Sequence, residues 1–503
     1  MINEKITNTL LSRALLLSSS ILLIIASFPG GGFPLLVCIA VAPALVATAK
    51  LKPIQSAFTL GLWAWFWWLV TLWWAIPSLT AFSNSSELVS VIIASLVCFT
   101  LALPYALSAF LIAYFKLWRS RLNLIQIPLC FAVLISLLSS VLPAAPVNAL
   151  FEYPVLLQGA DIGGLPLLMF FYFAFNTAIA SMFMQHKKDY SRIILLIILI
   201  IVLVLGYGNY KLSETEQMPA TRITIGYIQP LASPKDKLSS LLAQTKKLQT
   251  MPGAPELVIW PEVPVDFSWH DQQYERYRIR KLAKELDTHL IILSGYHYVN
   301  SKDIKDGHYN SANFISSKGE NIAEYRKQKL VPFFEYLPFK SYLASYFPGV
   351  RNYKPGETAV PFQYKELILA PLICYEALFT DLVRTYIDEG ANMIINPGND
   401  GWFGETGALS HLSLAVLRSI EYRVPLIRVN NSGVSTAVNH KGEILFNTLS
   451  PIDAQTEKVF SLDIHKGKQT FYYRYANLLN SVSMILLLIL FILSKQRQKE
   501  HRH

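Results

Sequence analysis

The sequence predicts a polytopic α-helical membrane domain joined to a separate α/β domain. Of the 503 residues, 52% are hydrophobic and only 16% are charged, whereas soluble domains have about 25% charged residues. The apolar residues are concentrated before about residue 208 and after about residue 478, and the block between them is polar. We therefore expect a membrane domain over residues 1–208, a polar domain over 209–477, and a membrane-spanning helix with a basic tail over 478–503.

Apolar stretches with the length of membrane spans occupy both flanks of the polar block. Most of them reach the ~20 residues that are needed to cross ~30 Å of hydrocarbon. The fourth stretch contains Pro104, which predicts a kink. The first could instead be a secretory signal peptide, but no convincing small-residue cleavage site follows it, so we expect it to be retained. About eight spans are thus predicted, over residues 9–27, 32–49, 56–77, 87–115, 123–142, 164–184, 192–208 and 478–494.

The basic residues of the short loops predict the orientation of these spans. The loops at 28–31, 78–86 and 143–163 contain no Lys or Arg. The alternate loops and the tail contain all the basic residues near the spans, so this side is expected to be cytoplasmic. Seven crossings then place the polar domain outside the cytoplasm. The basic residues are Lys5, Arg13, Lys50, Lys52, Lys116, Arg119, Arg121, Lys187, Lys188, Arg192, Lys495, Arg497, Lys499 and Arg502.

The net charge and the cysteines narrow the function further. The charge of +10 comes largely from these membrane loops, so it argues against nucleic acid as a partner. Cys38, Cys98 and Cys130 fall in predicted spans, which leaves Cys374 without an extracytoplasmic disulfide partner. The Cys and His residues also lack the spacing of a zinc site. A free thiol that faces an oxidising compartment favours a catalytic role for Cys374.

Within the polar block, short apolar runs alternate with amphipathic segments. This alternation is typical of an α/β layered domain. Strands are expected at 221–229, 256–260, 290–294, 312–316, 367–374, 393–396, 426–430 and 434–439, and helices at 271–287, 380–389 and 409–423.

Three reactive groups each follow an apolar run. Glu262 comes directly after a buried strand, where partial desolvation suits a general base; the alternative is an exposed glutamate in a turn. Lys327 could stabilise an oxyanion, or it could belong to a solvated basic face. Cys374 ends an apolar run and could be a nucleophile or a small buried hydrophobe. None of the three segments decides between its two interpretations alone.

Taken together, the segments resemble a known family. Trp-Pro-Glu at 260–262, Tyr-Arg-Lys at 325–327 with Leu-Val-Pro-Phe-Phe-Glu at 330–335, and Ile-Cys-Tyr-Glu at 373–376 resemble the Glu-Lys-Cys triad motifs of the nitrilase superfamily. With spans on both sides, the chain is similar over nearly its full length to the membrane-embedded apolipoprotein N-acyltransferase family. Supporting segments are Tyr309-Asn310-Ser311, Asn399 to Gly404, His411, Arg418 with Glu421, and Arg428 to Gly433.

The resemblance implies an αββα sandwich and a role for each residue of the motifs. It implies Glu262 as the base, Lys327 as the oxyanion stabiliser and Cys374 as the nucleophile. Lys327 is preferred to Lys329 because it stands eight residues before Glu335, the spacing of the family pattern. The resemblance further implies that Glu335 is a second essential carboxylate and that Tyr375 and Glu376 are neighbours in the site. The chain departs from the family at Phe334, where glycine is usual, and after Gln229, where a tryptophan is often found.

The resemblance also implies an activity. A fatty acyl chain would pass from a membrane phospholipid, through a thioester on Cys374, to the N-terminal amine of the S-diacylglyceryl cysteine of an apolipoprotein. The implied enzyme is a monomer without cofactor or metal in the bacterial inner membrane, with its catalytic domain on the periplasmic side. Two alternatives stay open: a membrane-tethered amidase that releases its product to water, and a transporter or scaffold with an inactive outer domain.

Two aromatic features have two interpretations each. Trp63, Trp65, Trp67, Trp68, Trp73 and Trp74 suit an interface or a lipid-facing wall, or they are plain lipid anchors. The stretch Phe333–Val350 could be an apolar lid over the thioester or an ordinary part of the core.

Overall fold

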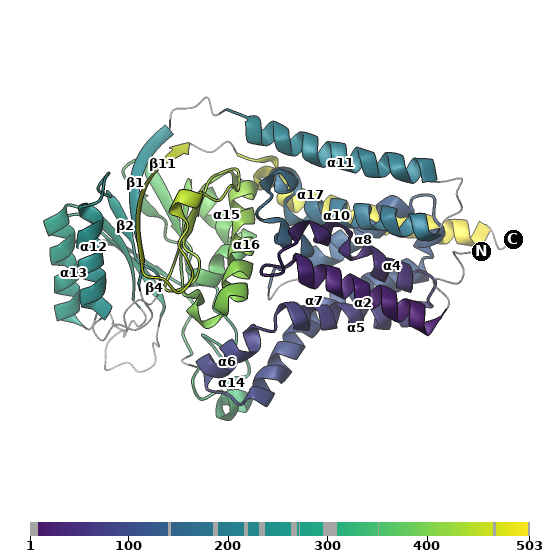
Figure 1. Ribbon diagram of the computed structural model, residues 1–503, viewed down its shortest axis with the longest axis horizontal. Helices are drawn as coiled ribbons and strands as arrows, with labels where there is room; N and C mark the ends of the chain where they lie inside the picture. Colours follow the sequence, from purple (N-terminus) through teal and green to yellow (C-terminus); the bar gives the residue numbers. More distant parts are fainter. Residues whose placement is uncertain are drawn as a thin grey trace. The chain divides into compact units, whose positions relative to one another are not determined.

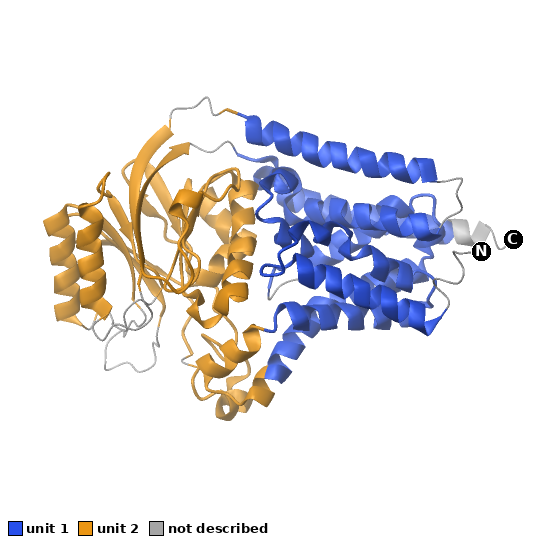
Figure 2. Cartoon of the chain, viewed as in Figure 1, with its two compact units in different colours: residues 1–73, 91–214, 469–503 blue, residues 74–90, 215–468 orange. Residues whose placement is uncertain are grey.

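A computed structural model describes residues 9–138, 142–184, 190–215, 220–230, 237–262, 269–270, 272–294, 309–350, 352–465 and 469–500. The chain divides into two compact units (Figure 2). Unit 1 comprises residues 1–73, 91–214 and 469–503, and unit 2 comprises residues 74–90 and 215–468. Unit 2 therefore contains most of the polar block together with residues 74–90, which come from the apolar N-terminal part of the sequence.

Unit 1 is helical, as a polytopic membrane domain requires (Figure 1). Among the described residues, five helices are long and apolar enough to cross a membrane: α2 (Leu10–Ser27), α7 (Glu87–Tyr114), α10 (Ala160–Met184), α11 (Tyr190–Ser213) and α17 (Phe471–Glu500). The other helices of unit 1 are α3 (Val37–Ala40), α4 (Ala42–Thr48), α5 (Pro53–Thr71), α8 (Asn123–Leu138) and α9 (Pro154–Leu157).

Among the described residues, fewer helices have the length of a full span than the eight apolar stretches suggested. The third stretch breaks after Thr71, and α5 is followed by the separate helix α6 (Ala75–Ser83); if this pair counts as one span, the described residues contain up to six. Within the stretches at 32–49 and 123–142, the described residues form the shorter apolar helices Pro34–Thr48 and Asn123–Leu138. An apolar run shows only that its side chains avoid water, and it does not fix the length of a helix. A proline such as Pro43, at the start of α4, still divides the run into short helices.

Three of the six tryptophans are internal, which corrects both interpretations for these three residues. Trp63, Trp67 and Trp68 are buried. The rings of Trp67 and Trp68 stack with centroids 4.5 Å apart, and Tyr105 of α7 meets Trp67 edge-on at 5.4 Å. Trp73, in contrast, is 58% exposed. Three of the six indoles thus form the core of unit 1 and are neither a lipid-facing wall nor lipid anchors.

This packing predicts a clear difference between two substitutions. Trp67→Ala leaves a large cavity in the core of unit 1 and should cost about 3–5 kcal/mol of stability. Trp73→Ala removes an exposed ring and should change stability little. Thermal unfolding of the two detergent-solubilised variants measures the difference, and equal losses would contradict the internal position of Trp67.

Unit 2 is an αββα sandwich, as the resemblance implied (Figure 1). The six-stranded sheet has the order β11-β1-β2-β3-β4-β5 and the five-stranded sheet has the order β10-β9-β8-β7-β6. Helices α12 (Lys237–Gln249) and α13 (Gln273–Leu286) lie on the side of the first sheet, and α15 (Thr380–Asp388) and α16 (Gly404–Tyr422) lie on the side of the second. A short helix, α14, spans Lys340–Leu343.

The strand bounds agree with most of the expected strands. The first sheet contains β1 (Ala220–Gln229), β2 (Leu257–Ile259), β3 (His289–Ser294), β4 (Ser311–Ile315), β5 (Asn321–Arg326) and β11 (Thr456–His465). The second contains β6 (Phe362–Tyr364), β7 (Leu367–Pro371), β8 (Met393–Gly398), β9 (Leu426–Asn430) and β10 (Thr436–Val438). Strands β5, β6 and β11 and helix α12 were not expected from the sequence.

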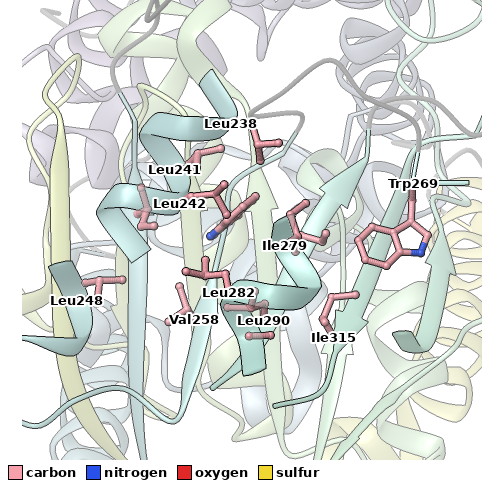
Figure 3. Close-up of a cluster of buried hydrophobic side chains, with 14 residues drawn as sticks. Leu238, Leu241, Leu242, Leu248, Val258, Trp269, Ile279, Leu282, Leu290 and Ile315 are labelled. Atoms are coloured by element: carbon pink, nitrogen blue, oxygen red, sulfur yellow. The ribbon is translucent and has the colours of Figure 1, made fainter. Parts of the chain in front are cut away.

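A hydrophobic cluster fastens the outer helices to the first sheet (Figure 3). Leu241 of α12 and Ile279 of α13 pack with Val258 of β2, and all three are fully buried. Trp260 belongs to the same cluster, and its indole Nε1 donates to Thr245 Oγ1 at 3.1 Å. This packing fixes the end of β2, and with it the position of the residue that follows the strand.

The topology brings the ends of several strands to one place. Strands β1, β2 and β3 run parallel to one another, and so do β7, β8 and β9. In sheets of this kind, functional side chains gather beyond the carboxyl ends of the parallel strands. Glu262 follows β2, Cys374 follows β7 and Asp400 follows β8, whereas Lys327 follows the antiparallel strand β5.

Candidate active site

The ammonium of Lys327 is the centre of the site. Its side chain is 1% exposed, and Nζ lies 3.1 Å from Glu262 Oε1 and 2.8 Å from Glu335 Oε1. Asn310 Nδ2 donates to the same two oxygens at 2.7 and 3.3 Å. Burial lowers the pKa of Lys327, but the two carboxylates more than offset this, so its pKa lies well above the ordinary value. Lys327 is therefore a permanent buried cation.

The two carboxylates are each fixed by further bonds. The backbone N–H of Glu262 donates to Gly398 O at 3.2 Å, and Asn431 Nδ2 donates to Glu262 O at 2.6 Å. Glu335 Oε2 accepts the backbone N–H of Val331 at 2.8 Å. Burial raises the pKa of Glu335, although Lys327 opposes the shift. One cation is thus shared by two carboxylates, both of them in the predicted set.

Cys374 begins the turn that follows β7 and has an unusual backbone. Its φ is +53°, in the left-handed region that non-glycine residues rarely adopt and that is often found at functional sites. The residue is buried, and Asn396 Nδ2 donates to its carbonyl oxygen at 3.0 Å. Burial raises the pKa of the thiol well above its usual range, Glu262 raises it further, and Lys327 opposes them. At neutral pH the thiol is protonated, so it needs a base before it can attack.

Glu376 holds the backbone beside Lys327 and beside Cys374 in place. Its Oε1 accepts the hydroxyl of Tyr325 at 2.7 Å and the backbone N–H groups of Gln328 and Lys329 at 2.6 and 3.0 Å. Its Oε2 accepts the N–H of Ile373 at 2.8 Å. Burial raises the pKa of this carboxyl to about 7, and Lys327 opposes the shift. Glu376 therefore ties the chain before Cys374 to the chain after Lys327, while its neighbour Tyr375 packs its ring on Phe379 at 4.7 Å.

The two lysines of the basic segment have different environments. Lys329 is 42% exposed and pairs with Asp381 at 3.3 Å. The interpretation as a solvated basic face fits Lys329 but does not fit Lys327. The eight-residue spacing from Glu335 therefore pointed to Lys327, the buried one of the two lysines.

Three charged or titratable residues beside Cys374 had no role assigned from the sequence. Asp400 Oδ1 lies 2.8 Å from His411 Nδ1, and Asp400 Oδ2 accepts Arg428 Nη2 at 2.6 Å. Ligand atoms of Cys374, Asp400 and His411 lie within 4.8 Å of one another, close enough to share a metal ion. However, the carboxylate is already paired with Arg428, whose fixed positive charge disfavours a cation there. A useful sequence signal was the position of Asp400, two residues after the end of a buried strand.

The segment Phe333–Val350 combines packed and exposed aromatic residues. Phe334, which replaces the usual glycine, packs on Phe82 of α6 at 5.4 Å and on Phe403 at 6.1 Å. The left-handed φ of +65° belongs to its neighbour Phe333. The rings of Phe339 and Tyr342 are exposed. Core packing thus describes only part of the segment, and its action as a lid stays a prediction. The missing tryptophan after Gln229 concerns a loop of which residues 231–236 lie outside the described residues.

Comparison with known proteins identifies the class to which this fold and site belong. Residues 232–467 match the carbon-nitrogen hydrolase family. A solved amidase from Nesterenkonia sp. is 18% identical, with a TM-score of 0.38, and is covered over 94% of its chain and 50% of this one. The family match, not this distant structural likeness, places residues 232–467 of the sandwich, with the buried cysteine, in the class of carbon-nitrogen hydrolase domains.

Longer matches give the particular family. An apolipoprotein N-acyltransferase from Geobacter metallireducens is 27% identical over 483 residues, which is 90% of each chain. Another from Rhizobium leguminosarum bv. trifolii is 30% identical over 396 residues, covering 71% of this chain and 72% of the relative. The chain belongs to the apolipoprotein N-acyltransferase family.

The backbone of Cys374 gives a prediction about stability. Glycine adopts a positive φ without strain, so Cys374→Gly should be more stable than Cys374→Ala by about 1 kcal/mol. In the same turn, Ala377 is buried and has no positive φ, so Ala377→Gly should destabilise by about 0.5–1 kcal/mol. Thermal unfolding compares the three variants, and a Cys374→Gly variant that is less stable than Cys374→Ala would contradict the strained turn.

Proposed function

We propose that this protein transfers a fatty acyl chain from a membrane phospholipid, through a thioester on Cys374, to the N-terminal amine of an apolipoprotein. The acceptor carries an S-diacylglyceryl cysteine at its N-terminus, and the reaction belongs to bacterial lipoprotein maturation. The observation that carries the proposal is the buried Lys327 ammonium, bonded to Glu262 and Glu335 and close enough to Cys374 to act on its pKa. The names of the family members support the same activity.

In the first half-reaction, Glu262 takes the proton of the Cys374 thiol, and the thiolate attacks an ester carbonyl of the phospholipid. The carbonyl oxygen becomes negative in the tetrahedral intermediate. Lys327 stabilises this oxygen, because a fixed cation in a water-poor site costs no reorganisation when the charge develops. The C–O bond then breaks, and Glu262 returns the proton to the leaving lysophospholipid.

Glu335 and Glu376 prepare Lys327 for this role. Glu335 bonds to Nζ directly, so it keeps the ammonium charged and aimed into the site. Glu376 bonds to the backbone directly after Lys327 and to the backbone directly before Cys374. It therefore sets the separation of the cation and the nucleophile. Tyr375, which directly follows Cys374, packs its ring on Phe379 and so supports the turn that contains Cys374.

In the second half-reaction, the amine of the apolipoprotein attacks the thioester and the thiol of Cys374 is released. An amide is more stable than the ester that is consumed, so no external energy source is needed. Neither half-reaction as written uses a cofactor or a metal. All the residues that take part come from one chain, and we propose that the enzyme acts as a monomer.

The membrane setting follows from the substrates, which are both anchored in lipid. We propose a seven-span domain over residues 1–208, in which the bent pair α5–α6 and the two shorter apolar helices each count as one crossing. The catalytic domain then occupies residues 209–477, and a last span with a basic tail occupies 478–503. The basic loops favour a cytoplasmic position for the tail. The catalytic domain is then on the periplasmic side of the bacterial inner membrane, where the spans hold it near the lipid headgroups.

The proposal is tested by intact mass after incubation with phosphatidylethanolamine vesicles in the absence of acceptor. We expect a mass increase of one fatty acyl chain that disappears in Cys374→Ala and on treatment with hydroxylamine. A synthetic peptide that begins with S-diacylglyceryl cysteine should then discharge the enzyme and gain the chain. Free fatty acid without acylated peptide would indicate an amidase-like hydrolase, and an unchanged mass would contradict any acyl-enzyme.

The two lysines provide a matched control in the same assay. Lys327→Ala removes the oxyanion contact and should slow acylation by about 10²-fold or more. Lys329→Ala removes an exposed charge and should acylate at nearly the rate of the unsubstituted enzyme. If acylation slowed equally in both variants, Lys327 would act only through its positive charge at a distance. A specific contact between Lys327 and the oxyanion would then be contradicted.

A further inference from the structure

An apolar groove lies between α10 and α11 of unit 1. Its volume is about 400 Å³, within the range of ~300–1,000 Å³ that is usual for ligand pockets. The lining includes Ile162 and Phe171 of α10 and Ile200 and Val204 of α11, and residues of α9 complete it. Nearly all the lining side chains are apolar, and all of them belong to unit 1. The groove is therefore a feature of the membrane domain alone.

The groove exists because α11 packs on its neighbours over only part of its surface. Of its 24 residues, Ile193, Ile200 and Gly208 are buried, and the helix runs along the outside of unit 1 (Figure 1). Near its end, α11 approaches α9 so closely that a side chain at Gly208 would collide with the carbonyl oxygen of Val155. Helix α10 is interrupted at Gly164, whose φ is +61°, so it does not follow α11 as a straight helix. Between these points an apolar surface stays open, and an apolar ligand would cover it favourably.

Charged side chains lie at one end of the groove. Tyr207 lines the groove, and its hydroxyl donates to Asp161 Oδ1 at 2.7 Å. One turn further along α11, Lys211 Nζ lies 3.8 Å from Asp161 Oδ2 and 2.7 Å from Glu214 Oε2. The side chains of Lys211 and Glu214 are 20% and 27% exposed, so a ligand can reach both. Ionisable residues in membrane-spanning helices are costly and usually functional, so this cluster is a candidate site for a polar headgroup.

The groove and the charged cluster together fit a phospholipid whose headgroup carries a primary ammonium. The lining residues of α11 run from Ile200 to Tyr207, about 10 Å along the helix axis, which accommodates the upper part of an acyl chain. Asp161 and Glu214 are negative and Lys211 is positive, so the cluster offers both signs with a net charge of −1. A phosphate would bond to the lysine, and an ammonium would donate to the carboxylates. Phosphatidylglycerol lacks the ammonium and is repelled by the net charge, and a quaternary ammonium has no N–H to donate.

We propose that the groove between α10 and α11 binds one phosphatidylethanolamine molecule, which fixes α11 to the rest of unit 1. The acyl chain lies along the groove, and the headgroup bonds to Asp161, Lys211 and Glu214. Helix α11 comes directly before the catalytic domain in the chain, so the bound lipid secures the last helix of the N-terminal membrane domain. The inference goes beyond the proposed acyl transfer and does not depend on it, because it uses residues of unit 1 alone.

The experiment is native mass spectrometry of the full-length chain in detergent with equal amounts of phosphatidylethanolamine and phosphatidylglycerol. Both lipids carry the same acyl chains, and Cys374→Ala is the background for every sample, so no lipid is consumed. Phosphatidylethanolamine should be retained about tenfold better than phosphatidylglycerol, because an additional charge-assisted hydrogen bond accounts for a factor of this size. This background also separates the result from the acyl-enzyme assay, which requires the thiol.

Two valines of α11 provide a matched pair that locates the lipid. Val204 lines the groove, so Val204→Trp fills it and should abolish retention of one phosphatidylethanolamine per chain. Val202 is 58% exposed and does not line the groove, so Val202→Trp should retain the lipid. Added phosphatidylethanolamine should also raise the unfolding temperature of Val202→Trp more than that of Val204→Trp.

A charge reversal tests the headgroup site without filling the groove, so it remains informative even if Val204→Trp does not fold. Glu214→Lys changes the net charge of the cluster from −1 to +1, and the preference should shift from phosphatidylethanolamine toward phosphatidylglycerol.

Three outcomes would overturn the inference. If Val204→Trp retains as much phosphatidylethanolamine as Val202→Trp, the lipid is bound elsewhere. If the background chain retains the two lipids equally, the groove holds ordinary bilayer lipid without selecting a headgroup. If Glu214→Lys leaves the ratio of the two lipids unchanged, the charged cluster does not bind the headgroup.

Discussion

The site depends on one electrostatic constraint: a single ammonium, on Lys327, neutralises two buried carboxylates. Burial of an unpaired charge costs several kcal/mol, so Glu262 and Glu335 can remain in the interior only while Lys327 and Asn310 bond to them. The same bonds keep Lys327 charged. The structure thus obtains a fixed cation beside a thiol. The two carboxylates that hold it, Glu262 and Glu335, are the groups to which the proposed mechanism gives the roles of base and of support for the cation.

The αββα sandwich makes this arrangement possible because it brings the ends of two sheets together. Glu262 and Lys327 follow strands of the first sheet, and Cys374 and Asp400 follow strands of the second. Glu376 joins the two sets through backbone bonds on both sides. In the proposed reaction the acyl chain passes first to sulfur and then to nitrogen. Polar groups from both sheets are therefore available on two sides of the Cys374 sulfur.

Much of this organisation could be predicted from the sequence, and the failures have physical causes. Glu262 and Cys374 were visible because each follows a buried strand with a strong apolar pattern. Strand β5 was missed because Asn321–Arg326 mixes polar and apolar residues without an apolar run, and its first two residues are exposed. The pairing of Asp400, His411 and Arg428 was missed because residues far apart in the chain meet only when the sheet forms. The tryptophans of α5 were misinterpreted because composition does not distinguish burial in protein from burial in lipid.

The most direct test of the central constraint is a double-mutant cycle on Lys327 and Glu335, measured as stability. Lys327→Met leaves two buried carboxylates without their cation and should lower the unfolding temperature markedly. Glu335→Gln removes one of these charges, so the double variant should recover part of the loss, with a coupling of about 1–3 kcal/mol. Simple additivity of the two single losses would show that Lys327 does not hold these carboxylates in the interior.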